Sequence, residues 1–179
     1  KTRMPTIKML ANMSYRYINL ARNYGLLDDE HIEKWAYGHM ERDSEPEWWF
    51  SELISAKTLE SVETVLMKAA LESERDKTFD GIPNFVSVNS WFAFLAYIQN
   101  QKSLTEVSDI VLDHVNHDDS QEAPVLLNVL ENLVNCSDIS VNELFKESEL
   151  AFYKTWVVTF FKELEVDANE WLYFKAPNG

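Results

Sequence analysis

Two histidines and several carboxylates are concentrated in one short segment, DHVNHDDSQE, at residues 113–122. His114 and His117 are three positions apart, so on a helix both imidazoles would lie on one side. Imidazole nitrogens and carboxylate oxygens are ligands that zinc and other transition metals accept, and Asp118 and Asp119 would complete such a set. One hypothesis is therefore a metal-dependent helical hydrolase that uses these four residues.

The same segment also has a purely structural interpretation. His114 falls on an apolar stripe with Val111 and Val115, which is typical of a histidine at the edge of a core. His117 lies near the expected end of its helix, where the dipole favours a cation. The aspartates that follow are typical N-cap residues for the next helix. We therefore expect no bound metal, and the hydrolase remains the alternative.

The chain lacks the short motifs of the common catalytic sites. It contains no HExxH, P-loop, GxGxxG or GxSxG sequence. Its single cysteine, Cys136, has no histidine nearby in the sequence, which is typical of a small apolar filler. One cysteine also excludes an internal disulfide and a cysteine-rich zinc site. We therefore expect a non-catalytic protein without a cofactor.

Acidic residues are densest around a pair of tryptophans, Trp48 and Trp49. Trp49 shares an apolar stripe with Phe50 and Leu53, whereas Trp48 lies off that stripe. Tryptophan is enriched at the centres of protein interfaces, and surrounding carboxylates would suit a basic partner. The alternative is that Trp48 packs against a third helix and that the carboxylates are solvated or cap helices. The predicted partner-binding residues are Trp48, Glu41, Asp43, Glu45, Glu47 and Glu52.

The charge balance narrows the class of partner. The chain of 179 residues carries 30 Asp and Glu against 16 Lys and Arg, a formal charge of −14. A binder of nucleic acid or of anionic membranes needs a basic face, so we expect neither. An acidic surface steers basic proteins towards it, although many proteins are acidic for solubility alone. No apolar run approaches the ~20 residues that span a bilayer, and we expect a cytoplasmic protein.

Composition and hydrophobic periodicity predict an all-α fold. Four glycines and five prolines are few for this length, which favours long helices joined by short loops. We expect one domain, residues 1–179, built as an irregular bundle of about eight helices, with a loop at 77–83 and a docked C-terminal tail at 165–179. The expected helices are residues 4–23, 28–42, 45–55, 58–76, 84–100, 104–115, 121–135 and 140–164. The last of these is one long helix or two helices broken near 147–149, and a strand at 85–88 is an alternative to the start of the helix at 84–100.

Residues 35–54 form the predicted centre of this arrangement, an antiparallel helical hairpin. Asp28 is the expected N-cap of its first helix. Ser44 is the expected N-cap of its second, with Glu47 closing a capping box. The apolar stripe of the first helix is predicted to be Ile32, Trp35, Ala36, His39 and Met40.

Two segments of the chain resemble each other. WFxxL followed by KTLxxVxxVL, at 49–66, matches FLxxI followed by KSLxxVxxIV, at 94–111. Helical hairpins that repeat at this spacing occur in HEAT-like arrays. A helical-repeat scaffold is therefore a further hypothesis, although any two amphipathic hairpins share such a pattern.

The segments LDDExIxxWA at 27–36 and PEWWFxxL at 46–53 resemble small helical immunity proteins of bacterial polymorphic-toxin and contact-dependent-inhibition systems. The resemblance covers less than a third of the chain. It implies a cytoplasmic, non-catalytic protein that binds and neutralises a cognate toxin, often a basic nuclease. Our leading hypothesis is accordingly an all-α protein that binds a basic protein partner through an acidic, aromatic face.

Overall fold

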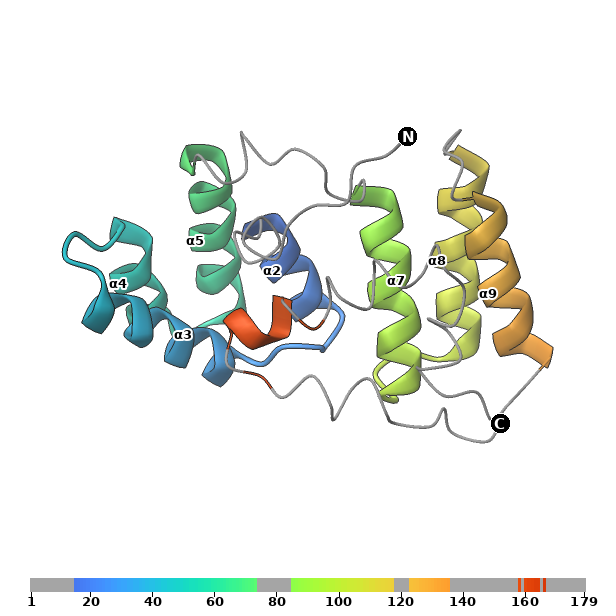
Figure 1. Cartoon of the computed structure of the whole chain (residues 1–179), viewed down its shortest axis with the longest axis horizontal. Coiled ribbons are helices and arrows are strands. Elements are labelled where there is room, and N and C mark those ends of the chain that lie inside the picture. Colours follow the sequence, from blue (N-terminus) through green and yellow to red (C-terminus); the bar gives the residue numbers. More distant parts are fainter. Residues whose placement is uncertain are drawn as a thin grey trace. The chain divides into compact units, whose positions relative to one another are not determined.

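The computed structural model describes residues 15–73, 85–117, 123–135, 158, 160–164 and 166, and these are helical apart from short connections (Figure 1). No strand occurs in these ranges, so the predicted all-α fold class is confirmed. Within them, each helix is too short or too polar to serve as a transmembrane segment. The helices are α2 (Tyr15–Asn23), α3 (Asp29–Arg42), α4 (Trp48–Ser55), α5 (Leu59–Glu72), α7 (Phe85–Ile98), α8 (Leu104–His117) and α9 (Ala123–Asn135).

The chain divides into two compact units. Unit 1 consists of Lys1–Asn23, Leu27–Ile82 and Trp156–Val166, and unit 2 of Tyr24–Leu26, Pro83–Thr155 and Asp167–Gly179. The predicted loop at 77–83 lies outside the described residues, as does the predicted tail at 165–179 apart from Val166. Both therefore remain predictions.

Unit 1 contains α2, α3, α4 and α5, with α4 in contact with both α3 and α5, and α2 in contact with α5. The predicted stripe of α3 is buried at Ile32, Trp35 and Ala36. Its last member, Met40, is 39% exposed, so the predicted stripe extends too far along the helix. Leu59 has the same helical spacing as the apolar residues that follow it, but it is 69% exposed because it opens α5 before the buried positions begin at Val62.

Helix starts in unit 1 agree with the sequence at two positions and differ at a third. Asp28 caps α3, and its side chain accepts a hydrogen bond from the His31 N–H at 2.8 Å. Thr58 caps α5 and forms a capping box with Ser61. The predicted cap at Ser44 is wrong, because the chain stays non-helical to Glu47, which is the N-cap of α4 and makes no side-chain capping bond.

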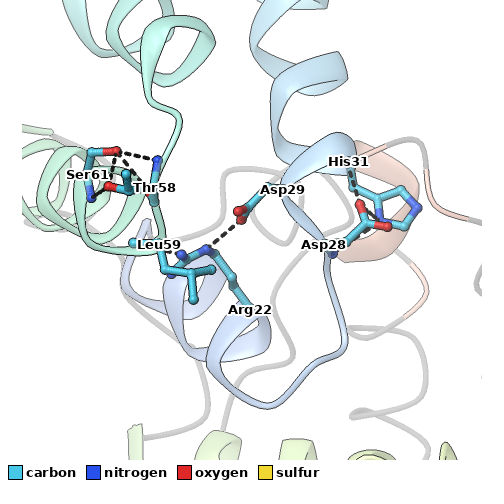
Figure 2. A network of polar contacts seen from close by, with 7 residues as sticks. All are labelled: Arg22, Asp28, Asp29, His31, Thr58, Leu59 and Ser61. Atoms are coloured by element: carbon cyan, nitrogen blue, oxygen red, sulfur yellow. Dashed lines mark hydrogen bonds and ion pairs between the residues drawn. The ribbon is translucent and has the colours of Figure 1, made fainter.

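A buried arginine ties three helix ends of unit 1 together (Figure 2). Arg22, near the end of α2, donates from Nε to Asp29 Oδ1 at 2.8 Å and from Nη2 to the Leu59 carbonyl oxygen at 2.7 Å. Its side chain is only 5% exposed, whereas that of Asp29 is 47% exposed. A buried guanidinium is tolerated where such partners satisfy its donors. Arg22 therefore fixes the first turns of α3 and α5 against the end of α2.

We expect Asp29→Ala to lower the free energy of unfolding by about 1–3 kcal/mol, because Arg22 would lose a charged acceptor while remaining buried. Glu30→Ala is the matched control: it removes a charge from the same first turn, and thus the same dipole interaction, without touching Arg22. Chemical denaturation followed by circular dichroism measures both. Equal stability of the two variants would contradict this role of Arg22.

Unit 2 contains α7, α8 and α9, which lie side by side in chain order (Figure 1). Every residue from Trp91 to Ile98 in α7 is buried. The segment WFAFLAYI at 91–98 is apolar nearly all round the helix, in agreement with this burial. Such a helix must be covered on several sides to be stable in water.

The segment that follows α2 is anchored within unit 2 at Tyr24 and Gly25. Gly25 has a left-handed conformation, with φ +75°, and a Cβ there would lie 2.7 Å from Gln101 Oε1. The Tyr24 hydroxyl donates a hydrogen bond to Asn89 Oδ1, and the Lys102 ammonium lies 5.3 Å from the centroid of the Tyr24 ring. Burial raises the pKa of Tyr24 to about 12.

This raised pKa predicts a pH dependence of stability. The fold favours neutral Tyr24, so its contribution is complete below pH ~10, the unfolded pKa, and is lost as the pH rises towards 12. We expect Tyr24→Phe, which cannot ionise, to lose less unfolding free energy than the wild type between pH ~10 and ~12. Denaturation across this range tests it, and parallel losses in the two proteins would contradict it.

The two similar segments both fold as a helix, a short turn and a second helix. In α4–α5 and in α7–α8 the second helix starts with a capping box, at Thr58 and at Ser103. In the capping box of α8, hydrogen bonds from the backbone and side chain of Ser103 lower the pKa of Glu106, and the nearby charge of Lys102 lowers it further. The first helices differ in length, 8 residues in α4 and 14 in α7. A true repeat architecture remains a prediction.

Candidate functional site

Unit 1 contains a pocket of about 660 Å³, within the usual range of ligand sites. We call it the Trp48 pocket. It is formed by the end of α3, the connection to α4, the start of α4, the end of α5 and the first residue of α2. The described lining residues are Tyr15, His39, Asp43, Ser44, Glu45, Glu47, Trp48, Trp49, Phe50, Glu72 and Ser73.

Packed aromatic rings support this pocket from inside unit 1. The His39 ring stacks on Phe50 with the centroids 4.2 Å apart and the planes 8° from parallel. Trp35, which is 1% exposed, meets both rings edge-on at 5.3 Å. The buried Trp49 Nε1–H donates to the Tyr15 hydroxyl at 2.9 Å. These contacts hold Trp49 and Phe50 in place, so one wall of the pocket is rigid and aromatic.

Trp48 lies at the pocket with its indole partly accessible. The residue is 40% exposed, and its ring meets the Trp49 ring edge-on with the centroids 5.7 Å apart. Its Nε1–H donates to Glu72 Oε2 at 2.7 Å. Trp48 therefore contacts a third helix, α5, through its N–H, and the residue is still 40% exposed. Its role in binding a partner remains a prediction.

The lining of the Trp48 pocket is strongly acidic. It includes the carboxylates of Asp43, Glu45, Glu47 and Glu72, and no lysine or arginine is among the described lining residues. The only described cationic candidate in the lining is His39, whose Nδ1 is 2.8 Å from Asp43 Oδ2. Carboxylates grouped in this way attract cations and repel anions.

Helix ends contribute to the same field. Helix α3 ends beside Asp43, its C-cap, and α5 ends at Glu72, so two C-termini with partial negative charge reach the pocket. The N-terminus of α4, at Trp48, opposes them with a partial positive charge. The four carboxylates make the electrostatic potential in the pocket negative, because each carries a full charge whereas a helix end carries about half of one.

The structure brings together four of the six predicted partner-binding residues. Asp43, Glu45, Glu47 and Trp48 line the pocket, whereas Glu41 and Glu52 are exposed side chains outside its lining. Sequence reasoning missed Glu72 and did not connect His39 with the pocket. Nothing in the local sequence indicates Glu72, because it meets Trp48 across 24 positions of the chain.

The two histidines of the alternative metal site make polar contacts with neighbouring residues of the chain. In unit 2, His114 Nε2 lies 2.9 Å from Asn89 Nδ2, and His114 Nδ1 lies 3.1 Å from Ser90 Oγ. His117 Nδ1 lies 2.7 Å from the Asp113 carbonyl oxygen, at the exposed end of α8. Asp118 and Asp119 lie outside the described residues. Across the described ranges, no group of three or more His, Cys, Asp or Glu is placed to hold a metal ion.

Comparison of the chain with protein-family models, curated proteins and solved structures finds no match. A functional conclusion therefore rests on the Trp48 pocket and its charges.

Proposed function

We propose that this chain is a non-catalytic binding protein that docks on a basic protein partner through the Trp48 pocket. The observation that carries the proposal is the composition of the pocket: a partly exposed tryptophan and four carboxylates, with no lysine or arginine among the described lining residues. Interfaces place their binding energy in such aromatic centres, and charge complementarity selects the partner.

The resemblance to bacterial immunity proteins extends the proposal to a biological role. In that role, docking would neutralise a cognate toxin in the bacterial cytoplasm. The formal charge of −14 supports it, because an acidic binder captures a basic toxin quickly at low ionic strength. Blocking a toxin requires occupation of a surface and no chemical step, which agrees with a pocket built from carboxylates and aromatic rings.

The test compares two double variants that change the net charge equally. Glu45→Lys/Glu47→Lys alters the pocket lining, and Glu41→Lys/Glu52→Lys alters exposed carboxylates outside it. A partner is first identified by capture on the wild-type chain, and association is then measured by stopped flow across a range of salt. We expect the first variant to slow association about tenfold or more at low salt and to flatten its salt dependence.

The second variant should have a clearly smaller effect, because only the overall charge changes. Equal effects of the two variants would show that net charge alone steers the partner, and they would rule out the Trp48 pocket as the docking site. Coexpression with the partner then tests neutralisation: the wild-type chain should restore growth or block the partner's activity, and the first variant should do so less well.

A further inference from the structure

We infer that the Trp48 pocket receives an arginine side chain of the partner. The inference rests on the proposed function, because it names the chemical group that the same pocket binds. The guanidinium would lie against the exposed part of the Trp48 ring and donate hydrogen bonds to the surrounding carboxylates. Two features of the lining select this group, namely its hydrogen-bonding character and its aromatic face, and the volume of the pocket leaves room for the residues that adjoin the arginine.

The charged groups of the lining are almost entirely hydrogen-bond acceptors. Ionised Asp43, Glu45, Glu47 and Glu72 accept and cannot donate. The indole N–H of Trp48 is already committed to Glu72 Oε2. A ligand that fits must therefore bring donors and few acceptors. Arginine brings five donors and no acceptor, in a planar fork that matches carboxylate oxygens.

The aromatic face favours guanidinium over ammonium. Trp48 is 40% exposed and its N–H is engaged with Glu72, and the π face of an indole ring attracts cations. Arginine stacks on aromatic rings through its flat guanidinium while its edge still donates hydrogen bonds. Lysine offers a compact, strongly hydrated charge that loses more hydration on entry. The pocket thus distinguishes two side chains of equal charge.

Glu72 is a positioning residue for this recognition. Its carboxylate is the hydrogen-bond acceptor that orients the Trp48 ring, and it reaches the ring from a different helix, α5. Removing the acceptor frees the indole to rotate about its side-chain torsions. Replacing the carboxylate with an amide removes the charge and keeps one acceptor oxygen, while the other oxygen is replaced by an NH₂ donor. Variants of Glu72 can therefore change the affinity for arginine separately from the selectivity for arginine over lysine.

The volume indicates a short segment rather than an isolated side chain. The pocket, at about 660 Å³, is larger than one arginine side chain, so residues adjoining the arginine would enter its mouth. The matched probes are three capped peptides that share flanking lysines and differ at one central residue: arginine, lysine or citrulline. Citrulline keeps the shape of arginine and lacks its charge.

Binding is followed on the full-length, ¹⁵N-labelled protein through the indole N–H resonance of Trp48, assigned by its loss in Trp48→Phe. We expect the arginine peptide to shift this resonance and to bind about fivefold or more tightly than the lysine peptide, with the citrulline peptide weaker still. Equal binding of arginine and lysine, equal binding of arginine and citrulline, or no shift at about 5 mM arginine peptide would overturn the inference.

Variants of Glu72 test the positioning role. Glu72→Gln should weaken binding of the arginine peptide and keep its preference over lysine, whereas Glu72→Ala should abolish the preference. Glu52→Gln, which removes the same charge outside the lining, should change neither. Equal selectivity in the two Glu72 variants would overturn the role of Glu72. Failure with the peptides would leave the effect of Glu45→Lys/Glu47→Lys on the partner's association intact, so the two proposals fail separately.

Discussion

The packing of aromatic rings between α2, α3 and α4 is the constraint on which unit 1 and its pocket depend. Trp35 lies at its centre and contacts Tyr15, His39 and Phe50 through their rings. Burial of each large side chain contributes roughly 1.5–3 kcal/mol, and ring geometry adds to it. Because Trp49 donates its N–H to Tyr15, the cluster also fixes the start of α4. The accessible indole beside it is therefore presented from a rigid base.

This arrangement connects packing with recognition through two adjacent tryptophans of different role. Trp49 is 4% exposed and belongs to the core, whereas Trp48 is 40% exposed and is held by Glu72 of α5. Preorganisation of this kind lowers the entropy cost of binding, since the ring that a partner meets is already oriented. The carboxylates around it supply attraction over a longer range. The start of α4 therefore contributes to the buried core through Trp49 and to the acidic, aromatic pocket through Trp48.

Local signals in the sequence predicted much of the fold but only part of the site. Asp28 was predictable as an N-cap, and Thr58 as the start of its helix, because capping depends on a few adjacent residues. Ser44 is also a residue type typical of N-caps, but the prediction was wrong there, because the chain remains non-helical for three further residues. The Arg22 tie and the Trp48–Glu72 hydrogen bond join residues 37 and 24 positions apart. Contacts between residues so far apart in the sequence depend on how the helices pack, and hydrophobic periodicity does not specify that packing.

Hydrogen–deuterium exchange on the complex with the captured partner tests the central claim most directly. If the Trp48 pocket is the docking site, backbone amides at 43–50 and at 72–73 should become protected on binding, with smaller changes in α8 and α9. Protection confined to α7–α9, with residues 43–50 unchanged, would contradict the account and move the interface to unit 2.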